Sequence, residues 1–461
     1  MKRNYILLLF AAALLLTSVQ PILAAITLPT MTEKTLDNGL KIIVVENREQ
    51  PVASMRLLIK SGTAADGKGK AGLADLTAGL LRKGTATRDA TKISEEIDFV
   101  GGNLGAGAGL DATNVTSEVL TKHFDVGLTL LADIVLNPTF AEAEIERLRK
   151  QTMAGLMSQK DDGETIANIQ YAQYLFGEHP YGQPGSGTIE SVSGITRDDI
   201  VGFWKATYVP ENSILFVAGD VVAADVIPKI EAQFGGWLKG NLAKIDVPPA
   251  PKVNGTRVVL INKADATQSN VKIGHLGIDR YNPDIYAVRV LNYILGGGGF
   301  RSRLMDDIRD KRGLTYGISS QFSFDRYPGE FTVSVATRTD STVQAIGATI
   351  EHLKKIREAD VTAQELSETI SFYSGYFPRQ FETPEQVANQ LSIVELYGLQ
   401  KDYLAKYIDN IAGVTAPAVR SAAQKYIDPE NLLIVVVGKA DELRDKLKIF
   451  GTVTEIDLFE L

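Results

Sequence analysis

The sequence predicts an α+β fold made of two homologous halves, each an antiparallel sheet packed with helices. The halves are recognised from two stretches, YVPENSILFVAGD at 208–220 and YIDPENLLIVVVGK at 426–439. Both contain a Pro-Glu-Asn turn followed by a buried strand that closes on glycine. Within each half strands come first, helices follow and a strand returns, an order typical of helices packed on an antiparallel sheet.

The similarity between the halves extends upstream of these two stretches. ITRDDIVGFWKATY at 195–208 matches VTAPAVRSAAQKY at 414–426, and a Thr-started helix with an acidic first turn precedes each of them. A segment rich in proline and glycine separates the halves and is typical of a linker. We therefore divide the chain into a signal peptide (1–25), an N-terminal peptidase-like domain (26–238), a linker (239–255) and a C-terminal peptidase-like domain (256–461).

The elements of the first half follow from its apolar patterns, taken in chain order. Two apolar runs predict strands, and a leucine stripe between Gly72 and Thr85 predicts a helix. A second helix, an alternating strand and a group of long helices follow. The predicted strands cover 40–47, 53–62 and 113–120, and the predicted helices cover 72–85, 91–100 and about 124 to 175.

The bulk composition excludes one class of partner. The chain has 461 residues, 44% of them hydrophobic and 23% charged, which is ordinary for a globular protein of two or more domains. Its net charge of -8 and the absence of Lys/Arg runs exclude nucleic acid as the main partner. There is no cysteine, so neither a disulfide framework nor a lipid-bearing cysteine is available.

The first 25 residues have the order of a secretory signal peptide. Lys2 and Arg3 precede an apolar run from Tyr5 to Leu16, and the segment ends in the small residues Ala24 and Ala25. An uncleaved membrane anchor is the alternative, but the run is short against the roughly 20 residues that a spanning helix needs. We expect an exported, periplasmic protein with no stable membrane anchor after cleavage.

Four stretches resemble the insulinase/pitrilysin/mitochondrial-processing-peptidase family of zinc peptidases. They are GLADLTAGLLRKGT, HPYGQPGSGT, LGGGGFRSRLMDDIRDKRGLTYGISS and YVPENSILFVAGD, and the resemblance covers nearly all of the mature chain. In that family the helix after Gly-Leu-Ala carries an inverted zinc motif, His-x-x-Glu-His. The two histidines bind the metal, and the glutamate activates the zinc-bound water.

The resemblance places that motif on residues that cannot perform its chemistry. Asp75 and Gly79 occupy the two histidine positions, Ala78 occupies the glutamate position, and Gly155 stands where the family has its third ligand. The only histidines are His123, His179, His275 and His352, and no two of them share a helical turn. We predict that this chain binds no metal and has no catalytic residues of its own.

A second family feature is present in the other half. Arg309 and Tyr316 lie seven positions apart around the Gly313-Leu314 turn, as a substrate-binding Arg/Tyr pair does in the family. An arginine offers several fixed donors to a substrate carbonyl, and a tyrosine hydroxyl can donate to a developing oxyanion. The alternative is that Arg309 forms an ion pair with Asp306 or Asp310 and that Tyr316 is a partly buried sheet residue.

Two glycine-rich segments belong to the chamber that the resemblance implies. Gly296, Gly297, Gly298 and Gly299 form a loop that in the family turns tightly beside this chamber. No Gly-Lys-Ser/Thr follows them, so they do not form a nucleotide loop. The segment 101–116 corresponds to a strand edge to which a peptide could add by β-augmentation, although its five glycines fit a flexible strand equally well.

These observations lead to a hypothesis of shared catalysis. The chain is expected to be the zinc-less subunit of a heterodimeric exported metallopeptidase, with zinc on a homologous partner that carries the intact motif and with peptides as substrate. The alternative is a non-enzymatic scaffold or peptide-binding protein of the same fold. A self-sufficient peptidase is disfavoured because the chain offers neither a ligand cluster nor a cysteine nucleophile.

Overall fold

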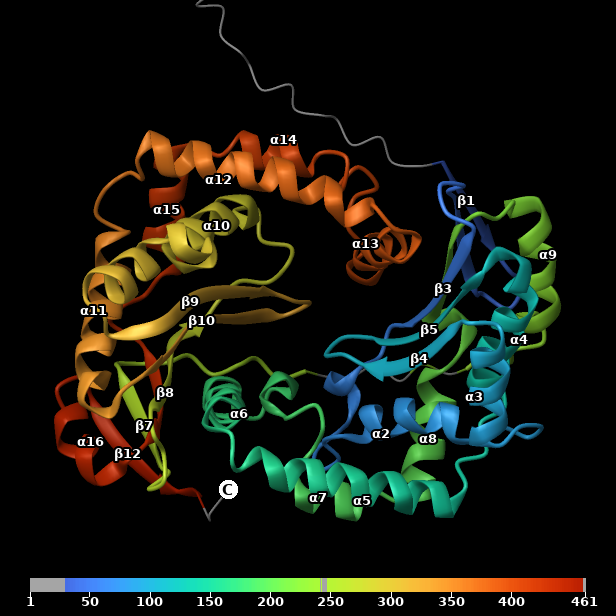
Figure 1. Ribbon diagram of the computed structural model, residues 1–461, viewed down its shortest axis with the longest axis horizontal. Coiled ribbons are helices and arrows are strands. Elements are labelled where there is room, and N and C mark those ends of the chain that lie inside the picture. The colour runs from blue at the N-terminus through green and yellow to red at the C-terminus, as the bar shows by residue number, and fades with distance from the viewer. Residues whose placement is uncertain (1–29, 241, 243–246, 459–461) are drawn as a thin grey trace, which may run out of the picture.

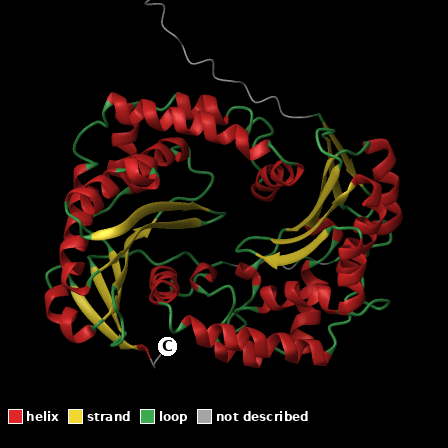
Figure 2. Ribbon diagram, in the orientation of Figure 1, coloured by secondary structure: helices red, strands yellow, loops and turns green. Residues whose placement is uncertain are grey.

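The computed structural model describes residues 30–240, 242 and 247–458. The predicted signal peptide, residues 1–25, therefore lies outside the described residues. Figures 1 and 2 show two groups of strands, each backed by helices and facing the other across the middle of the molecule. The predicted α+β fold with two similar halves is confirmed.

The first half contains a six-stranded sheet in the order β1-β2-β6-β3-β5-β4. Neighbouring strands are antiparallel except β2 and β6, which are parallel. The sheet is thus mixed, and not purely antiparallel as predicted, because β6 returns beside β2 after the helices. Its strands are β1 (Met31–Thr35), β2 (Lys41–Glu46), β3 (Val52–Ile59), β4 (Asn103–Ala108), β5 (Thr113–Leu120) and β6 (Ser213–Gly219).

The second half repeats this plan with the order β12-β7-β11-β8-β10-β9. Here β7 is parallel to both β11 and β12, and the remaining pairs are antiparallel. The two central strands that contain the repeated apolar runs, β6 and β11, are buried throughout. The strands are β7 (Arg257–Asn262), β8 (Ser269–Leu276), β9 (Thr315–Phe324), β10 (Pro328–Thr337), β11 (Leu433–Gly438) and β12 (Thr452–Asp457).

Helices pack around both sheets, most of them on the outer faces. In the first half they are α2 (Leu73–Leu80), α3 (Ala90–Phe99), α4 (Phe124–Leu136), α5 (Glu142–Gln159), α6 (Gly163–Phe176), α7 (Ile189–Gly194), α8 (Arg197–Thr207) and α9 (Ala223–Phe234). In the second half they are α10 (Ile285–Asn292), α11 (Thr342–Lys355), α12 (Ala363–Tyr376), α13 (Pro384–Tyr397), α14 (Tyr407–Ala412), α15 (Ala416–Tyr426) and α16 (Ala440–Leu447), with π-helical segments at Tyr293–Gly297 and Met305–Lys311. No helix of the described ranges is long and apolar enough to cross a membrane.

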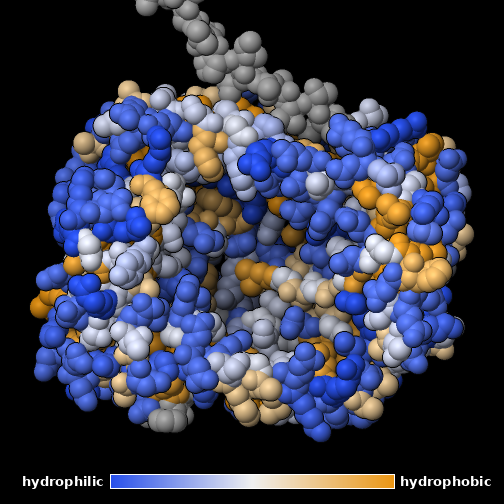
Figure 3. Space-filling model, in the orientation of Figure 1, coloured by the Kyte–Doolittle hydropathy of each residue, from blue (hydrophilic) through white to orange (hydrophobic). Residues whose placement is uncertain are grey.

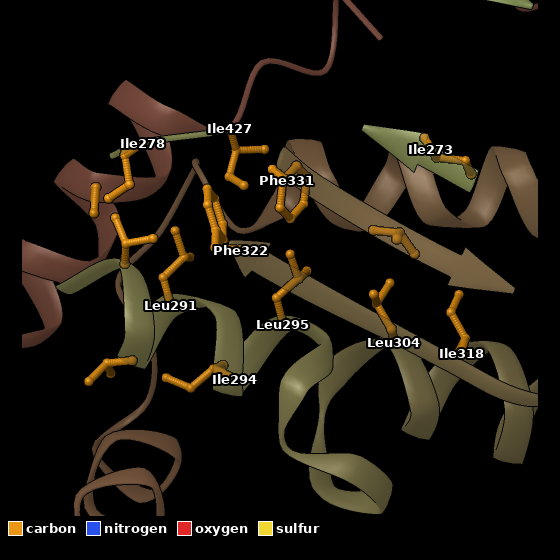
Figure 4. Packing of buried hydrophobic residues seen from close by; sticks show 14 of the residues in the cluster. Ile273, Ile278, Leu291, Ile294, Leu295, Leu304, Ile318, Phe322, Phe331 and Ile427 are labelled. Carbon is orange, nitrogen blue, oxygen red and sulfur yellow. The ribbon is translucent and has the colours of Figure 1, made fainter. Parts of the chain in front are cut away.

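The core of the second half is formed between its sheet and these helices. Figure 4 shows Leu291 and Leu295 packed towards Phe322 and Phe331 of the sheet, with Leu304 beside Ile318. Burial of each such side chain contributes about 1.5–3 kcal/mol of transfer free energy. This core fixes the segment that connects α10 to β9, which contains the glycine loop and Arg309.

Each half also contributes one helix to the inner face of the other half's sheet. Tyr171 of α6 is buried among Val259, Val435 and Val437 of the second sheet, and its hydroxyl donates to the backbone oxygen of Phe331 at 2.8 Å. Reciprocally, α13 packs its apolar face on the first sheet. Its contributions are Val387, Leu391 and Val394, which lie in one buried cluster with Ile43, Leu58 and Phe216.

The tips of two hairpins meet between the halves. Asp111, in the β4–β5 turn, accepts hydrogen bonds from the hydroxyl of Tyr181 at 2.8 Å and from that of Tyr397 at 3.1 Å. It also accepts a hydrogen bond at 3.1 Å from the backbone N–H of Arg326, which lies in the β9–β10 turn. One buried carboxylate therefore joins two elements of the first half to two of the second, and Figure 1 shows both hairpins pointing towards this place.

A second carboxylate, that of Asp325, lies close to Asp111 at the same junction. Burial raises the pKa of Asp325 to about 6, and the negative charge of Asp111 adds to this effect, whereas Arg280 opposes it. Arg280 lies over the ring of Tyr397 at 4.4 Å and supplies the positive charge at this junction. The contact between the halves therefore depends on charge as well as on apolar packing.

Candidate functional site

The helix α2 begins at a strongly constrained turn. Its N-cap, Gly72, has a φ of 92°, and a Cβ at this position would lie 3.0 Å from the backbone oxygen of Ser186. The carboxylate of Asp66 accepts hydrogen bonds from the N–H groups of Gly72 at 2.8 Å and Ala74 at 2.7 Å. Burial raises the pKa of Asp66 to about 7, and these backbone donors work against that rise. The frame of the motif helix is thus well defined.

The residues at the zinc positions of this frame do not fit a zinc ion. Ala78 is fully buried, and a Cβ on Gly79 would lie 3.2 Å from Leu148 Cδ2, so apolar packing occupies this part of the helix face. Asp75 is partly buried, and burial raises its pKa, which disfavours the charged form that a metal requires. Gly155 of α5 contributes no side chain. In the part of the chain that the structure describes, no group of three or more His, Asp or Glu residues could hold a metal ion.

Three of the four histidines have structural contacts. His179 is buried and caps the short turn Pro180–Gly182, where its Nδ1 accepts a hydrogen bond from the N–H of Tyr181. His275 Nε2 accepts a hydrogen bond from the N–H of Asp428, and His352 Nε2 lies 2.8 Å from Asp307 Oδ2. Two of these contacts hold backbone N–H groups and the third joins two side chains, and none of them joins one histidine to another.

Arg309 and Tyr316 lie next to each other in the second half. Arg309 is in the π-helical segment Met305–Lys311, and Tyr316 is the second residue of β9. Arg309 Nε donates to the backbone oxygen of Tyr316 at 2.9 Å, and the side chain of Tyr316 is 95% exposed. Both residues line a surface depression of about 340 Å³. The phenol is therefore available to a ligand and is not the partly buried sheet residue of the alternative interpretation.

Two further contacts hold the guanidinium of Arg309. Its Nη1 donates to Asp310 Oδ1 at 2.7 Å, which is the ion pair that the alternative interpretation expects. Its Cζ lies 4.7 Å from the ring centre of Phe300, a residue that sequence reasoning did not single out. Phe300 is 67% exposed. It directly follows the four glycines, and this aromatic residue at the end of a glycine run is the sequence feature that could have pointed to it.

The glycine loop is more regular than expected: Gly296 and Gly297 end the π-helical segment Tyr293–Gly297, and Gly299 begins the 3-10 turn Gly299–Arg301. A Cβ on Gly296 would lie 2.5 Å from the backbone nitrogen of Ser320, and one on Gly298 would lie 2.7 Å from the oxygen of Tyr293. A Cβ on Gly297 would lie 2.7 Å from the side chain of Asn292, and Gly299 has a φ of +60°. Backbone atoms leave no room for a side chain at Gly296 and Gly298, a side chain at Gly297 would displace Asn292, and one at Gly299 would strain the backbone.

The glycine-rich segment 101–116 forms the edge of the first sheet. β4 pairs only with β5, so its outer side is free of strand partners within the described sheet. A Cβ on Gly105 would lie 2.9 Å from Thr116 Oγ1, whereas one on Gly107 would meet nothing within 4 Å. The space-filling view is hollowed between the halves, on the side where both hairpins lie (Figure 3).

Comparisons with known proteins agree with this architecture. Residues 41–185 match the family model for insulinase (peptidase family M16), and residues 194–373 match the model for the peptidase M16 inactive domain. An uncharacterized zinc protease of Mycobacterium leprae is 32% identical over 303 residues, which are 66% of this chain and 68% of that protein. An uncharacterized zinc protease of Rickettsia bellii is 27% identical over 90% of this chain and 94% of its own length.

Solved structures give the same result. The chain is similar to a peptidase M16 inactive domain from Pseudomonas fluorescens, with a TM-score of 0.83 and 27% identity over 89% of this chain and 98% of that one. It also has the fold of the first half of the periplasmic protease PqqL from Escherichia coli, with a TM-score of 0.74 and 16% identity over 92% and 95% of the two chains. From the matched models, the relatives and the duplicated fold, we conclude that this chain belongs to the insulinase family, peptidase family M16.

Proposed function

We propose that the chain is the non-catalytic subunit of an exported heterodimeric zinc metallopeptidase. A homologous partner with the intact His-x-x-Glu-His motif would hold the zinc, and this chain would bind the backbone of peptide substrates through Arg309 and Tyr316. One observation carries the proposal: the zinc positions are occupied by Asp75, Ala78 and Gly79, while the Arg/Tyr pair is present and its phenol is exposed.

The site supports this role chemically. Asp310, Phe300 and the backbone oxygen of Tyr316 hold the guanidinium of Arg309, so its donors are oriented before a substrate arrives. Donors that are fixed in advance stabilise developing negative charge on a carbonyl oxygen without a reorganisation cost. The exposed hydroxyl of Tyr316 adds one more donor next to them. The first 25 residues and the periplasmic relative PqqL support export.

A non-enzymatic scaffold or peptide-binding protein is the second candidate. It is favoured by the ion pair between Arg309 and Asp310, because a carboxylate at 2.7 Å competes with a substrate for the same guanidinium. A scaffold has no need of an exposed Tyr316 beside Arg309, and this difference makes the heterodimeric peptidase the better supported function.

The two functions are separated by the variant Arg309→Ala in a complex with the zinc-motif homologue from the same source. Loss of one preorganised donor lowers turnover by about a hundredfold, and Tyr316→Phe should lower it by roughly tenfold. Arg312→Ala is the matched control, since Arg312 pairs with Asp307 and Glu351 nearby. Size-exclusion chromatography verifies that each variant still forms the complex. If Arg309→Ala and Arg312→Ala have the same turnover, the proposed role of Arg309 is wrong.

A further inference from the structure

A cavity of about 400 Å³ lies between α6 and the inner face of the second sheet. Its floor is formed by β8, β9 and β10, and the glycine loop forms part of its rim. Lys272 extends from the floor, and its Nζ donates to Ser334 Oγ at 2.6 Å. A lysine ammonium has three hydrogens to donate, so two remain for other acceptors.

The ammonium of Lys272 has no close counter-charge. Among the residues that the structure describes, no carboxylate oxygen lies within 4.0 Å of its Nζ. Burial lowers the pKa of Lys272, and the more distant Glu330 and Glu164 oppose this effect. Removing a charge from water without a partner is costly, so a charged group that is partly desolvated beside an open cavity is suited to a ligand of opposite charge.

The internal duplication supplies a direct comparison. Arg56 of β3 lies opposite Thr116 and Phe216, and Lys272 of β8 lies opposite Ser334 and Val435. Phe216 and Val435 each follow the repeated Pro-Glu-Asn turn by the same number of residues. Arg56 and Lys272 therefore occupy equivalent positions on the inner faces of the two sheets.

The covering helices are equivalent as well, but their carboxylates behave differently. Glu385 is the second residue of α13 and Glu164 the second residue of α6. In the first half the two side chains form a long ion pair, with Arg56 Nη2 at 3.9 Å from Glu385 Oε1. In the second half Glu164 and Lys272 both line the cavity, and no oxygen of Glu164 lies within 4.0 Å of Lys272 Nζ. The ion pair that one half forms is therefore missing between the equivalent residues of the other.

We propose that this cavity binds a carboxylate of a peptide, with Lys272 as its cationic ligand. The carboxylate can be the peptide's C-terminus or an Asp or Glu side chain, since both present the same group. Ala336 lines both this cavity and the depression at Arg309 and Tyr316, so one extended peptide reaches both places. The inference rests on the proposed function only in that the ligand is a peptide.

The test measures peptide binding to the isolated mature chain by isothermal titration calorimetry. Three N-acetylated peptides share one unfolded sequence without acidic residues. The first has a free C-terminal carboxylate, the second is the C-terminal amide, and the third is the amide with one central Glu. The expected result is that at least one carboxylate peptide binds about tenfold or more tightly than the plain amide. Preference for the first identifies the C-terminus, and preference for the third identifies the side chain.

Two variants make this test more specific, one that removes a positive charge from the cavity and one that removes a negative charge. Lys272→Gln should abolish the preference for the carboxylate, whereas Glu164→Gln should strengthen it by removing a like charge from the cavity wall. Lys68→Gln is the control, because the side chain of Lys68 is 91% exposed and lies at the surface. Thermal unfolding checks that each variant is folded, and the comparison of the three peptides on the unmodified chain needs no variant.

The outcomes are distinguishable from those of the proposed function. Equal binding of all three peptides, no binding of any, or a carboxylate preference that survives Lys272→Gln would each overturn the carboxylate site. None of these results concerns the activity of a complex. Conversely, a complex without peptidase activity would end the proposed function and leave the carboxylate preference of the isolated chain intact.

Discussion

Replacement of Asp111 should loosen the contact between the two halves. Its carboxylate is buried and accepts hydrogen bonds from Tyr181, Tyr397 and the N–H of Arg326. Asp111→Ala removes all three acceptor contacts at once. A hydrogen bond to a charged group contributes about 1.5–3 kcal/mol, and a buried donor without an acceptor costs about 1–3 kcal/mol.

One effect opposes this loss. The charge of Asp111 helps to raise the pKa of Asp325, so the two carboxylates repel each other, and removing one of them relieves that repulsion. Together these effects predict that Asp111→Ala lowers the free energy of unfolding by about 3 kcal/mol. The measurement is urea denaturation at pH 7, followed by circular dichroism.

Asp111→Asn is the matched control. An amide oxygen at the place of Oδ2 still accepts from Tyr397 and Arg326, and the amide nitrogen can donate to the hydroxyl of Tyr181, which lies 2.8 Å from Oδ1. We expect a loss of about 1 kcal/mol for this variant. Equal losses for Asp111→Ala and Asp111→Asn, or a loss below about 1 kcal/mol for Asp111→Ala, would refute the assignment of these hydrogen bonds as the link between the halves.

Two other predictions concern stability. Because the pKa of Asp325 rises from 3.8 to about 6 on folding, its contribution to stability is complete only well below pH 3.8 and is lost as the pH rises through 6. Relative to Asp325→Asn, the unmodified chain should therefore lose about 3 kcal/mol of unfolding free energy between about pH 3 and pH 7, and a difference that does not vary with pH would contradict the burial of this carboxyl. Gly296→Ala should cost about 1–3 kcal/mol in urea denaturation, because the new methyl group would lie 2.5 Å from the backbone of Ser320. Gly155→Ala, with open space in α5, should instead gain about 0.5–1 kcal/mol, and a gain from Gly296→Ala as well would show that the glycine loop is not closely packed.

Individual strands could be predicted because each has a characteristic pattern of turn residues and apolar residues within a short stretch of the sequence. The repeated Pro-Glu-Asn turns predicted the positions of β6 and β11, apolar runs predicted those of β2 and β3, and an alternating pattern predicted that of β5. The direction of β6 beside β2 could not be predicted, because an apolar run has the same pattern in a parallel and an antiparallel pair. We therefore expected purely antiparallel sheets, whereas both sheets are mixed.

The exchange of α6 and α13 could not be predicted either. The apolar positions of α6, such as Ile166, Tyr171 and Leu175, indicate a buried face and give no indication of which sheet covers it. The same limit hid Lys272, since a lysine in an alternating strand is expected to face water. It borders a partly closed cavity because a helix from the other half lies over that face.

The candidate site was predictable to the extent that sequence spacing determines proximity. Only a short turn separates Arg309 from Tyr316, so the sequence alone predicts that the two residues lie close together. The conformation of the Arg309 side chain depends on Phe300 and Asp310, and the sequence suggested the contact with Asp310 only as an alternative. The proposed loss of the zinc motif depends on residue types alone, because neither Ala78 nor Gly79, at positions that the resemblance assigns to the motif, supplies a ligand.

Hydrolysis of a quenched unfolded peptide tests most directly whether the site is shared between two chains. The mature chain, the zinc-motif homologue from the same source and their mixture are assayed side by side, each with and without a chelator. We expect activity that arises only in the mixture and disappears with the chelator. Zinc-dependent activity from this chain alone, or no gain of the mixture over the homologue alone, would contradict a shared site.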